Sequence, residues 1–509
     1  MTIENKILSL DDLARKSADL KEQGRTVVLC HGTFDLLHPG HIRHLRRARQ
    51  EGDCLLVTVT ADPFVNKGPG RPVFHHDLRA ENLASLECVD FVAINHDVTA
   101  VPVINLIRPN VYVKGQDYRA AENDITGNIV IEQKAVESSG GRVFYTNEIV
   151  FSSTSLLNEH FDIFPASTKE FLQKFRSRYQ AEAVIDRILS LDKLKVLVVG
   201  EAIVDEYCYS TPMGITGKSH EVLSVRFDAM EQFAGGSLAI ANHLAGFAAE
   251  VTLLTGLGHN DHHEPFVRSR LEERVKPAFF YFEQSQTLVK RRFVDAEARK
   301  LFEVYFYDPN PLTPAVEGKI IEWIQTHASA YDVVIVPDYG NGFISLDMVE
   351  ALCSTARFLA VNTQINSGSR GYHAITRYPR ADFVSLNEPE VRQAAHNRHD
   401  PLELVTKQIA QRVKANQIAI TMGSVGALLL DMDASTTHRV PALSTRVVDN
   451  IGAGDAFLSL AGLAIGGGLD SELALFLGSA AAALDVQIVC NRDPVRPVHL
   501  FKYITTLLK

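Results

Sequence analysis

Residues 447–457, which read VVDNIGAGDAF, place an aspartate directly behind a glycine turn. The β-branched run, the Gly-Ala-Gly-Asp turn and the small apolar residues that follow predict a strand, a turn and the start of a helix. Gly452 and Gly454 let the backbone come close to a bound group, and free amides at a helix start favour an anion. Asp455 beside such an anion is suited to take a proton from a substrate hydroxyl during phosphoryl transfer. The alternative is a helix cap, with Asp455 placed where the helix dipole favours a carboxylate.

Residues 31–41, HGTFDLLHPGH, carry two histidines around a Pro-Gly turn. The turn opens a basic amphipathic helix at residues 42–50, so His38 and His41 can both face whatever the helix N-terminus binds. Two imidazoles beside a phosphate chain can stabilise the charge that develops on a displaced pyrophosphate. A metal pair is one alternative, although no third ligand follows at a familiar zinc spacing. A purely structural turn is the other.

The elements that position these histidines alternate between helix and strand. Residues 8–23 have helical spacing, and Gly24 is placed to end that helix. Residues 26–30 and 54–60 are short apolar runs on either side of the basic helix. This βαβ rhythm predicts a parallel sheet whose ligands bind at the carboxyl ends of its strands.

The chain is too long for one ordinary core. With 509 residues it is expected to form at least two domains. Residues 163–192 are charged, helical in period and free of glycine, which predicts a helical connector rather than a flexible linker. The buried run at 194–200, LKVLVVG, then starts a second α/β region. We therefore expect one domain over residues 1–162 and another over residues 193–509.

Composition narrows the class of protein. Hydrophobic residues make up 46% and charged residues 22% of the chain, which is ordinary for a soluble globular protein. The formal net charge of -10 argues against a partner that is nucleic acid or an anionic membrane. Six cysteines without a CxxC pair indicate reduced thiols and a cytoplasmic location. Residues 1–25 are polar and charged, so we expect no signal peptide, and no run is apolar enough to span a bilayer.

The HPGH string resembles the His-x-Gly-His signature of the nucleotidyltransferase superfamily, whose cytidylyltransferase-like members have a Rossmann-like fold. The likeness extends to a Lys67 loop, to Asp77-Leu78-Arg79, to VKGQDY at 113–118 and to FSSTS at 151–155. It implies a reaction in which a phosphomonoester attacks the α-phosphorus of a nucleoside triphosphate and pyrophosphate leaves. Positioning, positive charge and Mg²⁺ serve such a reaction, and no protein nucleophile is needed.

This resemblance also implies residue roles. His38, His41 and Lys67 would be catalytic through contacts with the triphosphate. The remaining nucleotide or phosphate contacts would come from Gly32, Thr33, Phe34, Arg79, Lys114, Asp117, Ser153 and Thr154.

Residues 449–455 resemble the Asp-Thr-x-Gly-Ala-Gly-Asp signature of the ribokinase-like (PfkB) sugar kinases, with Asn450 in place of the usual Thr. Further matching segments follow the order of that family: GEAIVD at 200–205, FAGGSLAIAN at 233–242, TLVKRR at 287–292, VVIVPDYGNG at 333–342, VSLNEPE at 384–390, AITMGSVG at 419–426 and GSAAAA at 478–483. Two departures concern the sugar site. Ala239 stands where an Asn is usual, and Asn362 replaces a carboxylate.

The kinase resemblance implies that Asp455 is the catalytic base and that the 452–454 amides form an anion hole. Substrate contacts would come from Asp205, Gly235, Gly236, Lys290, Arg292 and Asp338. Nucleotide contacts would come from Thr421, Gly423, Gly426, Gly452, Ala453 and Gly454. Asn387 and Glu390 would organise Mg²⁺ and its water indirectly.

Together the two halves resemble the bifunctional heptose kinase and heptose-phosphate nucleotidyltransferase of lipopolysaccharide precursor synthesis, with the domain order reversed. The resemblance implies a kinase that uses ATP and a transferase that uses ATP or CTP, each with Mg²⁺, and a monovalent cation is a further candidate in the kinase domain. Sugar phosphates would be the substrates. Both families commonly dimerise, so a homodimer is expected.

Two other interpretations remain open. The GTFDLLHPGH string also resembles the glycerol-phosphate cytidylyltransferases, and the altered sugar segments fit a different sugar or polyol with CTP as donor. Alternatively, the kinase half is a non-catalytic sensor or scaffold. Asp455, Asn387 and Glu390 argue against that interpretation, because a dead kinase has no physical need for a base and a metal pair.

Overall fold

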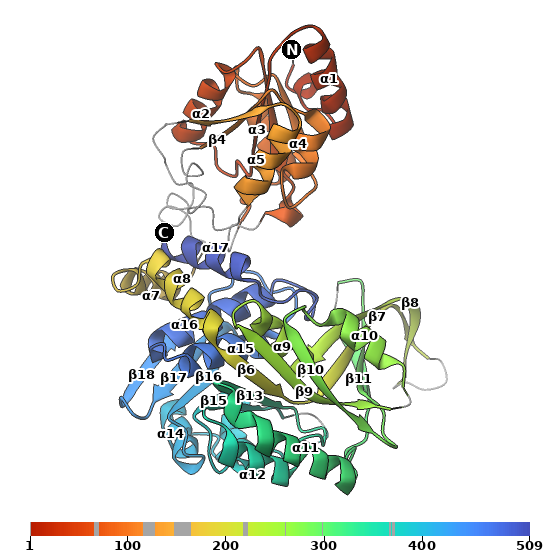
Figure 1. Cartoon of the computed structure of the whole chain (residues 1–509), viewed down its shortest axis with the longest axis vertical. Coiled ribbons are helices and arrows are strands. Elements are labelled where there is room, and N and C mark those ends of the chain that lie inside the picture. Colours follow the sequence, from red (N-terminus) through yellow and green to blue (C-terminus); the bar gives the residue numbers. More distant parts are fainter. Residues whose placement is uncertain are drawn as a thin grey trace. The chain divides into compact units, whose positions relative to one another are not determined.

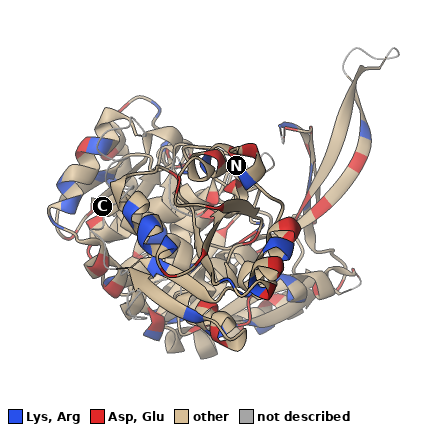
Figure 2. Cartoon of the chain, turned by 90° about the horizontal axis from the view of Figure 1, so that it is seen from above, with Lys and Arg blue, Asp and Glu red and all other residues tan. Residues whose placement is uncertain are grey.

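The computed structural model describes residues 2–65, 71–115, 128–146, 164–216, 222–259, 261–297, 299–365, 368 and 372–509. The chain divides into two compact units, Met1–Ile163 with Phe501–Lys509, and Phe164–Leu500. Both are α/β, as expected, and Figure 1 shows each unit built around sheets flanked by helices. Basic and acidic residues are interspersed over the helices and strands seen in Figure 2. Within the described residues, no helix has the length and apolar character needed to cross a membrane.

The first unit contains a five-stranded parallel sheet in the order β3-β2-β1-β4-β5. The strands are β1 (Val27–Gly32), β2 (Cys54–Thr60), β3 (Phe91–Asn95), β4 (Val111–Gly115) and β5 (Arg142–Thr146). The helices are α1 (Leu10–Glu22), α2 (Pro39–Arg49), α3 (His76–Ala84), α4 (Val101–Ile107) and α5 (Asn128–Ser138). The order of the strands reverses at β1, and in such sheets ligands bind where the order reverses.

Two apolar cores cover the two faces of this sheet. Buried residues of α2 and α3 pack on one face, and buried residues of α1, α4 and α5 pack on the other. The inner strands β1 and β2 are largely buried, which explains their near-continuous apolar sequences. The carboxyl ends of the strands are therefore left to carry the polar residues of a site.

The second unit contains a nine-stranded sheet in the order β10-β9-β6-β13-β14-β15-β16-β17-β18. Its strands are β6 (Lys195–Val199), β9 (Glu250–Gly258), β10 (Val275–Phe282), β13 (Val333–Asp338), β14 (Leu359–Thr363), β15 (Phe383–Asn387), β16 (Gln417–Thr421), β17 (Ala427–Asp431) and β18 (Thr436–Val440). Among the described strands of this sheet, β17 pairs in the antiparallel sense with both β16 and β18, and the other neighbours pair in parallel. A smaller sheet in the order β12-β11-β7-β8 is made of β7 (Ala202–Ile215), β8 (Leu223–Gly236), β11 (Leu288–Val294) and β12 (Lys300–Phe306).

Helices cover both faces of the nine-stranded sheet (Figure 1). One layer includes α9 (Ser237–Ala245), α15 (Ala453–Gly466) and α16 (Ser471–Asp485). The opposite core is shared by α11 (Pro314–His327), α12 (Leu346–Thr355), α13 (Glu388–Ala394) and α14 (Leu402–Arg412). Helix α10 (His263–Arg270) also belongs to this unit, whereas most of α17 (Pro497–Leu508) is counted with the first unit.

Residues 163–192 contain two helices, α7 (Ala166–Arg176) and α8 (Ala181–Leu189). They pack against α16 of the second unit. The rings of Phe175 and Phe476 stack with centroids 4.4 Å apart, and Arg178 forms an ion pair with Glu472. These helices therefore share the core of the second unit.

The prediction of a strand before the glycine turn is wrong. Residues 447–450 form no strand, and Val447 is 65% exposed. The amides of Val448 and Asp449 both donate to the carbonyl of Val486, the residue that caps α16. The hydrogen bonds to the C-terminal end of α16 thus fix the backbone of this β-branched run. These tertiary contacts override its local preference for a strand.

Candidate active sites

The glycine turn at residues 452–454 leads into α15 as predicted. Gly452 caps the helix with φ of 99°, and a Cβ there would lie 2.7 Å from Oδ2 of Asp485. A side chain is therefore excluded by both conformation and space. A Cβ on Gly454 would meet nothing within 4 Å, so the space over that residue is open. An open turn at a helix N-terminus suits a phosphate group.

Asp455 lies in the first turn of α15 and is half-buried. Its Oδ1 accepts a 2.8 Å hydrogen bond from the hydroxyl of Tyr339, which directly follows β13. Burial raises the pKa of Asp455 to about 7, the hydrogen bond from Tyr339 and the ammonium of Lys290 act to lower it, and the charge of Asp205 acts to raise it. A carboxyl group with a pKa close to neutrality is matched to general base chemistry.

Strands β7 and β11 bring a buried ion pair to the same region. Arg292 donates from a terminal guanidinium nitrogen to Oδ1 of Asp205, and both side chains are at most 7% exposed. Gly235 on β8 lies against this pair, because a Cβ there would overlap Oδ2 of Asp205. Three of the residues predicted to contact substrate therefore form one cluster. Gly236 beside them has φ of 60° and precedes α9.

Lys290 joins the same cluster from β11. Its Nζ lies 5.4 Å from the ring centroid of Tyr305 and 5.6 Å from that of Tyr339. Burial lowers the pKa of Lys290, although the charges of Asp205, Glu201 and Asp455 act in the opposite direction. The structure thus gathers predicted base and substrate residues with one buried ammonium and one buried guanidinium.

Two residues of this cluster were missed in the set predicted from sequence. Tyr339 contacts Asp455, and Glu201 accepts hydrogen bonds from the amides of Tyr339 at 3.2 Å and Asn341 at 3.1 Å. Burial, with the charge of Asp338, raises the pKa of Glu201 to about 7. Both residues lie in segments that match the kinase family, at 200–205 and 333–342, and this was the sequence signal for a role in the site. Their partners could not be predicted, because these are distant in sequence.

The expectation that Asp338 contacts substrate is corrected by its surroundings. Asp338 is 1% exposed, and its carboxylate is bound by His373, Arg377 and Tyr378 at distances of 3.1, 2.9 and 2.8 Å. These partners occupy both oxygens, so Asp338 fixes the end of β13 and the position of Tyr339. No sequence pattern indicated Arg377 or His373 as its partners.

Asn387 and Glu390 form a reciprocal capping box at the start of α13. The backbone N–H of Glu390 donates to Oδ1 of Asn387 at 2.9 Å, and the backbone N–H of Asn387 donates to Oε2 of Glu390 at 2.8 Å. Burial raises the pKa of Glu390 to about 7, and Asp455 adds to this effect. The two oxygens of Glu390 thus accept the backbone N–H groups of Asn387 and Ile365.

The predicted nucleotide turn follows β16. The Thr421 hydroxyl donates to the carbonyl of Leu386 at 3.4 Å, and a short 3-10 turn spans Gly423–Val425. A Cβ on Gly423 would meet nothing within 4 Å, whereas one on Gly426 would overlap the backbone of Val440 and Pro441. Gly423 therefore leaves open space, and Gly426 allows close packing.

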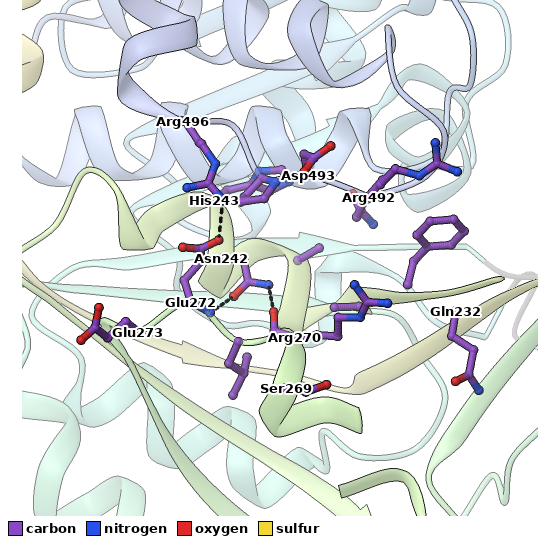
Figure 3. Close-up of a pocket in the computed structure, with 16 residues that line it drawn as sticks. Gln232, Asn242, His243, Ser269, Arg270, Glu272, Glu273, Arg492, Asp493 and Arg496 are labelled. Carbon is purple, nitrogen blue, oxygen red and sulfur yellow. Dashed lines mark hydrogen bonds and ion pairs between the residues drawn. The ribbon is translucent and has the colours of Figure 1, made fainter. Parts of the chain in front are cut away.

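A cavity of about 260 Å³ lies between β8, α9 and residues 491–496 (Figure 3). Its lining includes none of the residues predicted to act as the base or to contact sugar or nucleotide. The cavity is therefore distinct from the cluster at Asp455. Asn242 donates to the carbonyl of Arg270 and accepts from the amide of Glu272, as Figure 3 shows. This Asn, three residues beyond Ala239, thus holds the turn after α10 together.

In the first unit, the two histidines of HPGH lie at the N-terminus of α2 as predicted. His38 caps the helix, and its Nδ1 accepts a 3.1 Å hydrogen bond from the amide of Gly40. The neutral ring therefore carries its proton on Nε2. The His38 and His41 rings stack with centroids 3.9 Å apart, and Phe34 packs edge-on to His41 at 5.5 Å. The turn from Gly32 through Thr33 thus delivers both imidazoles to one place.

Arg79 has a different role from the one expected. It is fully buried, and its guanidinium donates to the carbonyls of Phe74, Thr33 and Thr60 and to Oδ1 of Asp62. A side chain bonded in this way has no surface for phosphate, so the expected phosphate contact is corrected. Arg79 instead braces the loop that follows β1.

Lys114 at the end of β4 pairs with Glu132 at 2.8 Å, and Glu132 also accepts from the hydroxyl of Tyr112. The other nucleotide contacts predicted for this unit lie outside the described residues: Lys67, Asp117, Ser153 and Thr154.

The fold and the arrangement around Asp455 define a sugar-kinase type of α/β protein, and comparison with known proteins agrees. The chain belongs to the pfkB family of carbohydrate kinases, whose family model matches residues 193–492. Residues 29–159 match the cytidylyltransferase-like family, so the transferase-like segment precedes the kinase. Both resemblances drawn from sequence are thereby confirmed.

The chain is also similar to proteins named bifunctional protein HldE. The one from Methylobacillus flagellatus is 39% identical over 153 residues, which are 30% of each chain. The one from Geobacter sulfurreducens is 41% identical over 140 residues, which are 27% of each chain. The matched part thus spans less than a third of these relatives.

Among solved structures, phosphofructokinase-2 from Escherichia coli in complex with substrates and products has a TM-score of 0.50 and 15% identity. That match covers 62% of this chain and all of the other, and it supports the fold of the second unit.

Proposed function

We propose that this chain is a bifunctional enzyme that makes a nucleotide-activated sugar. One half phosphorylates a sugar phosphate of the heptose type with ATP, and the other transfers a nucleotidyl group to a sugar 1-phosphate with release of pyrophosphate. The observation that carries the kinase half is Asp455, which lies half-buried behind an open glycine turn with its pKa raised to about 7. The similarity to proteins named bifunctional protein HldE supports the pairing of the two activities.

In the kinase step, Asp455 takes the proton of the attacking sugar hydroxyl while the 452–454 amides hold the transferring phosphoryl group. Asp205 and Arg292 orient the sugar, and Gly235 leaves the room that this requires. Lys290 and Arg292 supply two cations in the cluster, which suits a substrate that itself carries a phosphate.

Mg²⁺ and ATP fit the residues present to different degrees. The open space over Gly454 and Gly423 fits a phosphate chain and a nucleotide. Asn387 and Glu390 bond to each other, so they would hold a hydrated rather than a directly bound Mg²⁺. When bound, the ion neutralises charge on the phosphates.

In the nucleotidyl step, His38 and His41 at the start of α2 stabilise the pyrophosphate as it leaves. The bond from the Gly40 backbone N–H leaves the proton of a neutral His38 ring on Nε2, the nitrogen that would donate to a phosphate oxygen. Phosphate groups approach the helix N-terminus, where backbone amides add to the positive potential.

The test is a product assay on the full chain with each half measured separately. ADP formation is followed with ATP and a panel of sugars that includes heptose 7-phosphate. Pyrophosphate release is followed with ATP or CTP and the corresponding 1-phosphates. Release with ATP and a heptose 1-phosphate supports the proposal. Release only with CTP and another phosphate selects a different sugar or polyol.

We also propose that the chain forms a homodimer through the β7–β8 ribbon. This ribbon exposes large apolar side chains, among them Met213 at 65%, Ile215 at 63% and Phe227 at 58%. An exposed apolar surface of this kind marks an interaction site. Light scattering should give twice the chain mass for the wild type, and Phe227→Glu with Ile215→Glu should give a monomer.

A further inference from the structure

Three side chains with metal-binding atoms, none of them part of HPGH, lie close together in the first unit. Asp62 follows β2 in a short 3-10 turn, and His75 and His76 stand at the start of α3. Their ligand atoms all lie within 4.8 Å of one another. The two histidines are adjacent, and the aspartate lies 13 positions before His75, so their proximity depends on the fold.

The distances fit a small divalent ion. Oδ2 of Asp62 lies 3.1 Å from Nε2 of His75 and 3.0 Å from Nδ1 of His76. A tetrahedral zinc site with bonds of about 2.1 Å separates neighbouring ligand atoms by roughly 3.4 Å, so small shifts would admit the ion. His75 is 58% exposed, which leaves a path from solvent, while Asp62 and His76 are about one-fifth exposed.

His75 and Asp62 each have a supporting partner behind them. Asp77 places one oxygen 3.2 Å from Nδ1 of His75 and the other 3.9 Å from Nε2 of His76. The second oxygen of Asp62 accepts from buried Arg79 at 2.5 Å. Histidines that bind metals usually present their other ring nitrogen to a carboxylate, which sets the tautomer and the orientation of the ring.

We propose that Asp62, His75 and His76 bind a divalent transition-metal ion of the zinc type, with water completing its coordination. One carboxylate and two imidazoles are the ligand set that such ions accept. The ion would tie the end of β2 to the start of α3. Because Arg79 connects Asp62 to the carbonyl of Thr33, it would also stiffen the loop that leads to HPGH. The proposal rests on these contacts and does not depend on the proposed activities.

The experiment titrates the metal-stripped full chain with Zn²⁺ by calorimetry and with Co²⁺ by visible absorption. We expect one equivalent of Zn²⁺, d–d bands for bound Co²⁺, and a higher Tm with Zn²⁺. His76→Ala and Asp62→Asn should each lose this binding and this rise in Tm. Asp77→Asn should keep the site but weaken it about 10- to 100-fold.

Two histidine variants serve as matched controls. His96 lies edge-on to His76 with ring centroids 6.0 Å apart but is not among the three ligands, and His399 is exposed in the second unit. His96→Ala and His399→Ala should bind Zn²⁺ like the wild type. Circular dichroism checks that each variant is folded. Equal binding by the wild type and by Asp62→Asn, or no binding by the wild type, would overturn the proposal.

Discussion

The hydroxyl of Tyr339 donates a 2.8 Å hydrogen bond to Oδ1 of Asp455, joining the end of β13 to the first turn of α15. Burial raises the pKa of Asp455, and this bond is the first of the contacts that oppose the rise. Tyr339 therefore helps to set the pH at which the carboxylate is ionised and can accept a proton.

The pH dependence of the kinase should show this effect. Only ionised Asp455 can act as a base, so the rate should fall as pH drops through about 7. Tyr339→Phe removes a donor that stabilises the ionised form, so the acidic limb should move to higher pH. Profiles of kcat/KM for the sugar, measured at saturating ATP, check this. An unchanged limb would contradict the assigned role of Tyr339.

Removal of the carboxylate should separate the two activities. Asp455→Asn keeps the size of the side chain but cannot take a proton. Kinase turnover should fall by about 10²–10⁴-fold or more, which is the range for general base catalysis. Pyrophosphate release by the other half should be unchanged and serves as the internal control. Kinase turnover at the wild-type rate would rule out Asp455 as the base.

The same variant should be more stable than the wild type at high pH. The pKa of Asp455 is about 7 in the folded chain against a reference of 3.8, so the folded state holds its proton more tightly. The stability linked to this group is present at low pH and is lost as pH rises through about 7. We expect Asp455→Asn to raise Tm by about 2 °C or more at pH 8. Near pH 5 the gain should shrink, and a gain that grew at low pH would reverse the assignment.

A methyl group beside Asp205 should impair sugar binding. Gly235→Ala places a Cβ where Oδ2 of Asp205 lies, so the carboxylate must move from Arg292. We expect the KM for the sugar to rise by about 10-fold or more, which corresponds to roughly 1.4 kcal/mol. Gly318→Ala at an exposed position of α11 is the matched control, because its Cβ would meet nothing within 4 Å. The control should leave KM unchanged, and equal effects of the two would contradict the role of Gly235.

A histidine variant should affect only the first half. His41→Ala removes the ring that stacks on His38 and contacts Phe34. Loss of one group that stabilises developing charge typically lowers kcat by about 10²–10³-fold, and we expect that loss in pyrophosphate release. ADP formation by the kinase should remain at the wild-type level. A parallel loss of both activities would indicate general unfolding instead.

The sequence by itself determined those features that depend on neighbours along the chain. The glycine turn before Asp455 and the helix start at His38 and His41 follow from local spacing, since turns and caps are set by nearby residues. The alternating apolar runs likewise predicted two α/β regions, because strand and helix periods are local. The family matches agree with these local patterns.

Tertiary structure decided which distant residues meet. Tyr339 and Asp455 are 116 positions apart, and Asp205 and Arg292 are 87 apart. Such pairs depend on which strands and helices become neighbours in the sheets, and no local spacing encodes that order. The packing of neighbouring elements also explains why residues 447–450 form no strand and why Arg79 donates to backbone carbonyls. It likewise explains why Asp62 lies beside two histidines. Burial adjusts the chemistry further, because a carboxyl group such as Asp455 acquires its raised pKa only when the chain folds around it.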